Sequence, residues 1–226
     1  AEITFVGLDN IEDVDYTFNG TEQKVQIASI KINDIEFFDT EGDYISVIYK
    51  RNSEITEDFI SAGVINIRVE ANNNDNIAGF YDYSYTIKQK TFDSGIIKVS
   101  GLEDRPYNRE KQIFDITLLD EQANNYELKQ DKDYTITFSS DCINVEKDIV
   151  ATFTPINGNY KGQAFTKTFS INKAVIDSFQ LTVNKSVYSS TPHNITATVK
   201  AGEFEIYDTE TYNEYQLIFR REGSAV

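Results

Sequence analysis

The residues of this chain that could support nucleophilic catalysis are its single cysteine, Cys142, and its single histidine, His193. Such chemistry needs a base that is oriented beside the nucleophile. His193 lies in a Ser-Thr-Pro-His-Asn turn that opens a later part of the chain, so the pair would have to bridge two parts of the protein. We therefore interpret Cys142 as a small apolar residue at the end of a strand, and we predict that no residue is catalytic.

Metal sites usually draw on His and Cys clusters for zinc or on dense acidic loops for calcium. One cysteine and one histidine exclude the zinc cluster. The densest acidic run comprises Asp9, Glu12, Asp13 and Asp15 and is a candidate calcium loop, but a solvated acidic loop is the interpretation we favour. We predict neither a metal nor another cofactor.

Asn74, Asp75 and Asn76 could form a ligand loop or a cation site. Asn, Asp and Gly also tolerate a positive φ, which is what a tight hairpin turn requires. The related turn PINGNYKG at 155–162 lacks the acid of the first turn, which favours a plain hairpin in both places.

Two other kinds of chemistry find no support in the pattern of residues. Glycoside hydrolysis needs two carboxylates that project into one cleft, and among so many acidic residues nothing singles out a pair. The Asn-x-Ser/Thr sequences at Asn19, Asn184 and Asn194 are as frequent as chance predicts. We therefore predict that the protein is not an enzyme.

The composition indicates a globular, acidic, all-β protein. Hydrophobic residues make up 40% of the chain, with Tyr (14) and Phe (15) as the bulky ones, and β-branched residues are plentiful. Acidic residues outnumber basic ones by 37 to 21, which gives a net charge of −16 that would repel nucleic acid. No apolar run approaches the roughly 20 residues that cross a bilayer, so we expect no membrane insertion.

An internal repeat of about 84 residues organises the chain. An aromatic residue with a polar turn recurs at Phe18, Tyr107 and Tyr188, and an acid–Tyr step recurs in the same order. The acid–Tyr steps are at Tyr44, Tyr134 and Tyr215. The closing phrase also occurs twice, as NNDNIAGFYDYSYTI at 73–87 and NGNYKGQAFTKTFSI at 157–171.

The repeats define three predicted domains, at residues 1–91, 92–175 and 176–226. The last of them has no counterpart of the segment VINIRVE at 64–70 or of a closing strand. We expect the natural protein to continue beyond Val226, and the alternative is completion of this domain by another chain. The start at Ala1 without Met likewise indicates a processed protein or an excised fragment.

Alternating apolar and polar residues predict half-buried strands, because successive strand side chains point to opposite faces. Inward rows are expected at Ile65, Ile67 and Val69 and, in the second domain, at Ile149, Ala151 and Phe153. The segment SEITEDFISAG at 53–63 is either a short helix or a longer connection. Short strands with regular turns predict an antiparallel β-sandwich, with a β-grasp fold as the rival that requires a crossover helix.

These motifs resemble the tandem immunoglobulin-like repeats of bacterial surface and secreted proteins. The matching residues are FNG at 18–20, Asp43-Tyr44, Asp133-Tyr134, and GNYKG at 158–162 with Phe169 and Ile171. The first domain departs from the pattern, since Ile77 replaces the Tyr of GNYKG. The resemblance implies spacers and adhesive modules of the cell surface.

Lys167 falls in an apolar row between Phe165 and Phe169, where an unpaired ammonium would be costly to bury. The resemblance raises a covalent Lys–Asn cross-link as one explanation. A lysine at a sheet edge with its head in water is the simpler one.

The sequence therefore predicts a non-enzymatic, extracellular tandem β-sandwich protein, at the cell surface or secreted, that acts as a semi-rigid stalk or as an adhesive module. Expected partners are the adjoining domains of the same chain and a host or cell-surface glycan or protein. The alternative is a carbohydrate- or peptide-binding accessory module of a larger secreted protein, which would use exposed aromatics such as Tyr126, Tyr207 and Tyr212. No ligand-binding residue is assigned.

Overall fold

A computed structural model describes residues 2–6, 9–32, 34–37, 45–72, 78–176, 178–183, 195–202 and 204–206. These residues form strands, turns and one short 3-10 turn, η1 (Ile11–Asp13), which Asn10 caps through a hydrogen bond from the backbone N–H of Glu12. The described residues contain no α-helix. The prediction of an all-β chain with antiparallel sheets is confirmed.

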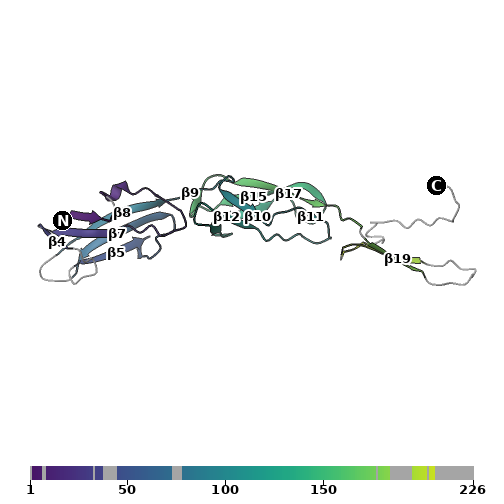
Figure 1. The fold of residues 1–226 in the computed structure, drawn as a ribbon, viewed down its shortest axis with the longest axis horizontal. Coiled ribbons are helices and arrows are strands. Elements are labelled where there is room, and N and C mark those ends of the chain that lie inside the picture. Colours follow the sequence, from purple (N-terminus) through teal and green to yellow (C-terminus); the bar gives the residue numbers. More distant parts are fainter. Residues whose placement is uncertain are drawn as a thin grey trace, which may run out of the picture. The chain divides into compact units, whose positions relative to one another are not determined.

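Residues 1–91, which we call the first segment, form two sheets (Figure 1). One sheet has the order β1-β3-β4, with β1 (Glu2–Phe5), β3 (Ile27–Ile32) and β4 (Ile35–Phe37). The other has the order β2-β8-β7-β5-β6, with β2 (Tyr16–Thr17), β8 (Phe80–Lys88), β7 (Gly63–Ala71), β5 (Ile45–Arg51) and β6 (Glu54–Ile55).

Residues 92–175, the second segment, form sheets with the same order of pairing. One contains β10 (Ile97–Ser100), β12 (Thr117–Asp120) and β13 (Tyr126–Leu128). The other runs through β11 (Arg105–Pro106), β17 (Phe165–Asn172), β15 (Glu146–Pro155) and β14 (Tyr134–Phe138). In addition, β9 (Lys90–Thr91) pairs with β16 (Tyr160–Lys161), and a last sheet joins β18 (Ser178–Val183), β19 (Ile195–Ala201) and β20 (Phe204–Ile206).

The two segments also share a parallel pair in sheets that are otherwise antiparallel. β2 runs parallel to β8, with Tyr16 opposite Ile87, and β11 runs parallel to β17, with Arg105 opposite Ile171. These short strands come directly before the aromatic–Asn turns of the sequence. The recurring turns therefore follow equivalent strands.

The two aromatic–Asn turns have the same hydrogen bonds. In each, the Asn side chain accepts from the backbone N–H two residues on, at 2.9 Å between Asn19 and Thr21 and at 3.0 Å between Asn108 and Glu110. This local bond fixes a turn without help from the sheet. The Asn of this motif thus has a structural role in both segments.

The cores lie on the inward rows that the alternation predicts. Ile65 and Ile67 in β7 have no solvent exposure, and Val69 is 5% exposed. In β15, Ile149, Ala151 and Phe153 are fully buried. Every second side chain of each strand therefore points into the core, as expected when successive side chains point to opposite faces of a sheet.

The sequence motifs align Tyr44 with Tyr134. The strand register does not support this alignment. The registers of the two strand pairs place Val47 opposite Val69 and Ile136 opposite Phe153. With the inward rows aligned, Ile45 and not Tyr44 holds the place of Tyr134, and both side chains are buried. Tyr44 itself lies outside the described residues.

The segment 53–63 is a connection and not a helix. It begins with β6 and continues as an irregular loop up to β7. Its residues Thr56 and Asp58 bind nearby backbone N–H groups with their side chains, which competes with helix formation. The crossover helix that a β-grasp fold requires is not found among the described residues.

The chain divides into two compact units. The first comprises residues 1–102, 114–139 and 150–168, and the second comprises residues 103–113, 140–149 and 169–226. The first unit thus contains residues of both segments, among them Phe18, Tyr126 and Tyr160. The domain boundaries at residues 91 and 175 stay a prediction.

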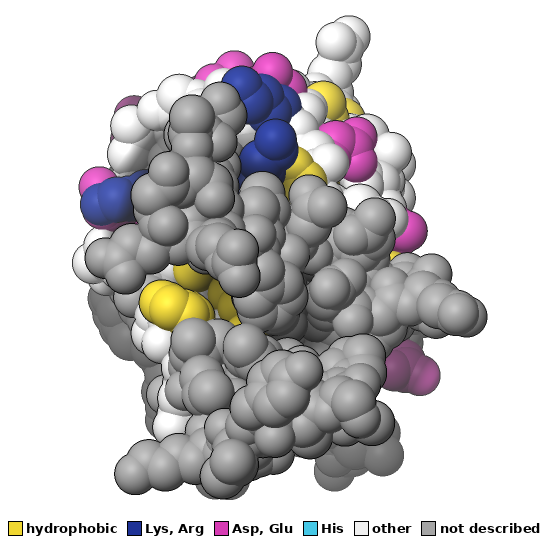
Figure 2. Space-filling model, turned by 90° about the vertical axis from the view of Figure 1, so that its right-hand side faces the viewer, with side chains coloured by type: hydrophobic (Ala, Val, Ile, Leu, Met, Phe, Trp, Pro, Cys, Tyr) yellow, Lys and Arg dark blue, Asp and Glu magenta, His cyan; other side chains and the backbone are white. Residues whose placement is uncertain are grey.

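Acidic and basic side chains are mixed on the described part of the face drawn in Figure 2, with small hydrophobic areas between them. The net charge of −16 therefore does not gather into a patch of one sign there. No helix among the described residues has the length and apolar character needed to span a bilayer.

Candidate functional site

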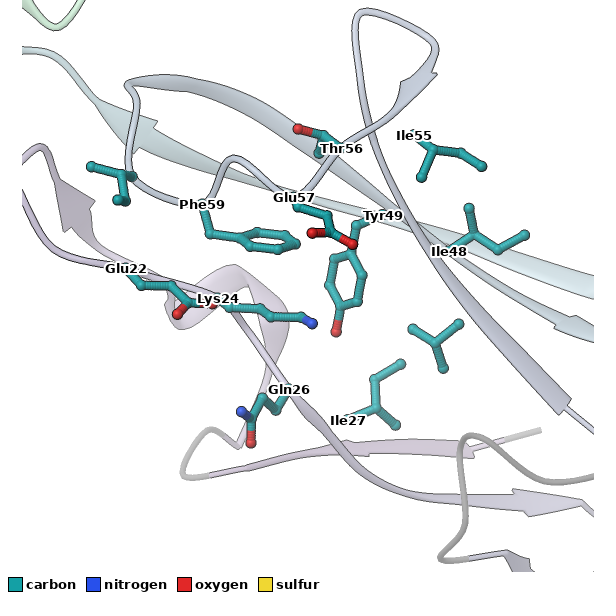
Figure 3. A pocket seen from close by; sticks show the side chains of 12 residues that line it. Glu22, Lys24, Gln26, Ile27, Ile48, Tyr49, Ile55, Thr56, Glu57 and Phe59 are labelled. Atoms are coloured by element: carbon teal, nitrogen blue, oxygen red, sulfur yellow. The ribbon is translucent and has the colours of Figure 1, made fainter.

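A groove of about 820 Å³ opens in the first segment beside Tyr49 (Figure 3). Three pieces of chain form its walls: the extended residues 22–27, strand β5, and the loop at 55–60. Exposed or half-exposed isoleucines line much of it, namely Ile27, Ile48, Ile55 and Ile60. Ile55, with 76% of its surface exposed, is the most accessible of them.

The floor of the groove is an aromatic pair with a cation over it. The rings of Tyr49 and Phe59 meet edge to face, with centroids 5.1 Å apart and planes at 85°. The ammonium of Lys24 lies 4.7 Å from the Tyr49 centroid and 4.9 Å from that of Phe59. Figure 3 shows the Lys24 side chain pointing toward these rings. An edge-on ring pair and a cation over it are each worth roughly 0.5–1 kcal/mol.

Arg51 holds the loop that forms one wall. Its guanidinium donates to the backbone carbonyls of Asp58 (3.0 Å), Ser61 (2.9 Å) and Ala62 (3.0 Å). The rigid fork of an arginine suits several carbonyls at once. The loop is therefore fixed to β5 by one side chain.

Asp58 fixes the same loop from within. Its Oδ1 accepts from the N–H groups of Ile60 (3.1 Å) and Ser61 (2.9 Å). Partial burial alone would raise the pKa of Asp58, but these hydrogen bonds and the charge of Arg51 outweigh it and lower that pKa. The carboxylate stays ionised near neutral pH and keeps the loop closed.

Two tyrosine hydroxyls tie the third wall to the sheet. Tyr49 donates to the carbonyl of Val25 (2.7 Å), and Tyr85 donates to that of Gln23 (3.0 Å). The backbone N–H of Gln23 in turn donates to the backbone carbonyl of Phe59 at 2.8 Å. Burial raises the pKa of Tyr85 to about 12. Residues 22–27 are thus anchored without belonging to a strand until Ile27.

A second candidate site is the junction between the two segments. Phe18, 1% exposed, packs against Tyr126 with ring centroids 5.0 Å apart and against Tyr160 at 5.4 Å. Gly20 follows Phe18 in the turn and has φ +74. A Cβ built on it would lie only 2.3 Å from the carbonyl oxygen of Ala123. The FNG motif therefore inserts a ring and a bare backbone into the second segment.

An ion pair lies behind this ring cluster. Lys90 Nζ lies 2.7 Å from Oδ2 of Asp120, whose side chain has no solvent exposure, while that of Lys90 is 14% exposed. Tyr160 donates its hydroxyl to the same carboxylate at 3.1 Å. Burial, with the charge of Asp120 beside it, raises the pKa of Tyr160, so this hydroxyl stays a donor.

Backbone groups complete the junction. The N–H of Ala62 donates to Asn159 Oδ1 at 2.9 Å, and Gln89 Nε2 donates to the carbonyl of Gly158 at 2.9 Å. The N–H of Lys90 donates to the carbonyl of Asn159 at 2.9 Å. The turn NGNYKG, which the sequence gives as a plain hairpin, is therefore also a contact of the first segment.

Of the two candidate residues for catalysis, only Cys142 lies among the residues that the structure describes. Cys142 is 1% exposed, and burial raises the pKa of its thiol, which disfavours the thiolate. His193 lies outside the described residues, as do Asn74, Asp75 and Asn76, Asn184 and Asn194, and Tyr207 and Tyr212. The side chain of Asn19, from the first Asn-x-Thr sequence, also accepts from the Thr21 hydroxyl.

The acidic run does not form a ligand cluster. Asp15 forms an ion pair with Lys88, and no group of three or more potential ligands gathers among the residues that the structure describes. Lys167 is exposed, although it shares a strand face with the buried Phe169. The expectation that Tyr126 is an exposed aromatic is wrong. It is half-buried, packs on Phe18 and donates to Asp133 at 3.0 Å.

The groove residues are the site that the sequence does not reveal. Lys24, Tyr49 and Phe59 are spread over three pieces of chain, and their spacing carries no motif. The one available signal is the segment 53–63, which is longer in the first segment than in the second. Long connections often carry function.

Comparison with protein-family models, with curated proteins and with solved structures finds no match. The resemblance to bacterial immunoglobulin-like repeats therefore stays a prediction from the sequence motifs.

Proposed function

We propose that residues 1–91 and 92–175 are tandem copies of one immunoglobulin-like domain in a non-enzymatic, extracellular stalk or spacer protein. The observation that carries the proposal is the packing of Phe18 of the first segment against Tyr126 and Tyr160 of the second. A spacer works only if consecutive domains do not swing freely. A ring that is 1% exposed at the junction is what limits such movement.

The polar contacts at the junction support the same proposal. The Lys90–Asp120 pair and the Asn159 contact with Ala62 are directional, so they favour one arrangement of the two segments over others. In this proposal the adjoining domains are the first partners of each domain. The protein lies at the cell surface or is secreted.

Backbone NMR relaxation tests whether the junction is rigid. We expect amides of β7 and of β15 to report one common tumbling time in the native chain. In the Phe18→Ser variant the two sets should report different, shorter times. A native chain in which β7 and β15 already tumble independently would contradict the spacer proposal.

A second candidate function is binding of an extended peptide in the Tyr49 groove, as an adhesive or accessory module. The apolar walls favour a peptide over a carbohydrate, because Lys24 already covers the ring faces on which a sugar would stack. Strand β5 borders the groove, and among the described residues this edge pairs with β6 at Lys50 and Arg51 and accepts one more backbone bond, from Thr56 to the carbonyl of Tyr49. Its remaining length offers an edge to which an extended peptide could add.

Screening of a peptide library against the chain tests this second function, with Ile55→Asp as the blocking variant. Ile55 is exposed, so the change leaves the core intact. The matched control is Ile113→Asp, at a site that is 81% exposed and does not line the groove. Peptides that bind the native chain and the control but not Ile55→Asp would support the groove. Equal binding to both variants, or no binding peptide at all, would contradict it.

A further inference from the structure

The loop that forms one wall of the Tyr49 groove has a shorter counterpart in the second segment. Gln23 and Gln112 hold equivalent places, each of them four residues after the Asn of its aromatic–Asn turn. The backbone N–H of Gln23 donates to the carbonyl of Phe59 at 2.8 Å, and that of Gln112 donates to the carbonyl of Cys142 at 2.9 Å. Both loops therefore return to the same anchoring hydrogen bond, one at Phe59 and the other at Cys142.

The loop of the first segment is six residues longer. The strand registers match Tyr49 with Phe138. Phe59 follows Tyr49 by ten positions, whereas Cys142 follows Phe138 by four. Because the shorter loop already makes the anchoring hydrogen bond, the framework of the domain does not need the extra residues. What they add is the groove wall at residues 55–57. Connections of this kind, on a framework that is complete without them, often carry function.

Strand β5 presents backbone groups to the groove. The carbonyl of Tyr49 accepts from the N–H of Thr56, so the backbone groups of Tyr49 point away from β7. Alternate residues of a strand turn their backbone groups to the same side. Val47 therefore turns its N–H and its carbonyl to this edge. No backbone hydrogen bond from a described residue reaches Val47 there, and an extended chain can pair with it.

Apolar side chains lie on both sides of this edge. Ile55 pairs with Lys50 and so lies on the same face of the sheet as Ile48. Val47 points to the opposite face, as its cross-strand partner Val69 does. A chain that pairs with the edge would place alternate side chains against Val47 on one face and against Ile48 and Ile55 on the other. The groove therefore suits an extended segment with apolar side chains.

Two carboxylates at the groove have no charge partner among the residues that the structure describes. Glu22 and Glu57 are exposed and line the groove, and Figure 3 shows the Glu57 carboxylate pointing into it. The one cation of the lining, Lys24, lies over the rings of Tyr49 and Phe59. Residues 1–91 contain seven basic and 17 acidic residues, which gives this segment a net charge of −10. Both the groove and its surroundings thus attract a cationic ligand and repel a second copy of the chain.

We propose that the Tyr49 groove binds an extended apolar peptide that carries lysine or arginine. The peptide backbone pairs with β5 at Val47, and the cationic side chain forms ion pairs with Glu22 and Glu57. The inference rests on the second candidate function, peptide binding in this groove, and specifies the class of peptide. A neutral peptide leaves both carboxylates without a partner, and an acidic one is repelled by them.

Three peptide libraries provide the test. They share a randomised core of seven positions and have lysine, glutamine or glutamate at both ends of that core. Fluorescence anisotropy then gives the affinity of the tightest peptide from each library for the full chain. We expect the lysine-flanked peptide to bind about tenfold more tightly than the same core with glutamine, since each of two exposed ion pairs adds at most a factor of about five. The Val47 amide should exchange more slowly in the complex.

A pair of double variants locates the charge that matters. Glu22→Gln with Glu57→Gln should remove the preference for lysine over glutamine. Glu12→Gln with Glu103→Gln is the matched control, because both side chains are exposed, lie outside the groove lining and carry the same total charge. This control should keep the preference. All four changes are at exposed positions, so the fold is retained.

The outcomes separate this inference from the candidate function on which it rests. Equal affinity for the lysine- and glutamine-flanked peptides, or an equal loss of preference in both double variants, would overturn the cationic ligand and leave peptide binding standing. No binding peptide in any library would reject both. A dimer in sedimentation that Ile55→Asp dissociates would assign the groove to a second copy instead. None of these results bears on the spacer proposal, which the junction experiment tests.

Discussion

Lys90 and Asp120 form an ion pair in which the carboxylate has no solvent exposure and the ammonium nitrogen lies 2.7 Å from it. Asp120 Oδ1 also accepts from the backbone N–H groups of Gln122 (2.9 Å) and Ala123 (3.1 Å). The carboxylate therefore fixes both the linker and the turn after β12. Removing its charge would leave the Lys90 ammonium without its partner in a largely buried place.

The Asp120→Asn variant should lose about 3 kcal/mol in free energy of unfolding, because one charge of a buried pair is left uncompensated. Urea denaturation measures this loss. The control is Lys98→Met, which removes an exposed pair with Glu121 and should leave the urea midpoint unchanged. Similar effects of the two changes would show that the buried pair has no special role.

Truncation of Phe18 should destabilise the chain by about 3 kcal/mol, because Phe18→Ala removes a buried ring from its contacts with Tyr126 and Tyr160. Phe80→Ala is the matched control, since its ring is 58% exposed, and should cost under about 1 kcal/mol. Thermal unfolding followed by circular dichroism compares the two. An unfolding midpoint of Phe18→Ala equal to that of the unchanged chain would contradict this expectation.

Arg51→Lys should loosen the loop at 58–62 although the charge is kept. A lysine cannot reproduce the fork that binds Asp58, Ser61 and Ala62. Hydrogen exchange of the Ile60 and Ser61 amides should speed up by at least about tenfold, since charged hydrogen bonds of roughly 1.5–3 kcal/mol are lost. Unchanged exchange at these amides would mean that Asp58 alone holds the loop.

Alkaline pH should destabilise the chain, with Tyr85 as one cause. Burial raises the pKa of Tyr85 from 10.0 to about 12. Between these values the unfolded state loses the phenolic proton while the folded state keeps it, so the free energy of unfolding falls as pH rises from 10 toward 12. Below pH 10 this contribution is fully retained.

The Tyr85→Phe variant separates this effect from the rest. It lacks the hydrogen bond to Gln23, so it should be less stable near neutral pH by about 1 kcal/mol. Its stability should nevertheless fall less steeply above pH 10. Burial also raises the pKa of Tyr160, so the variant should keep part of the loss of stability with rising pH. Parallel pH profiles of the two chains would exclude Tyr85 as a cause.

The local pattern predicted the strands well, since alternation reports directly which side chains enter a core. Ile65, Ile67 and Val69 are buried as expected. The pattern could not fix the match of Tyr44 with Tyr134, because a shift of one residue preserves the aromatic motif but reverses the face. Only the pairing register of β5 with β7 resolves it.

The contacts between segments were beyond the reach of the sequence. Tyr126 is expected from the sequence to be exposed, yet Phe18 packs on it from more than a hundred positions away. The Tyr49 groove likewise depends on distant pieces of chain that Arg51 and Tyr85 hold together. Long-range packing has no periodicity that a single sequence could display.

The burial of Cys142 has a consequence for the chain outside a reducing environment. A lone accessible thiol would join molecules in pairs wherever oxidants are present. With the sulfur enclosed and reluctant to ionise, such pairing requires local unfolding first. Purified chain left in air should therefore migrate as a single species on a non-reducing gel.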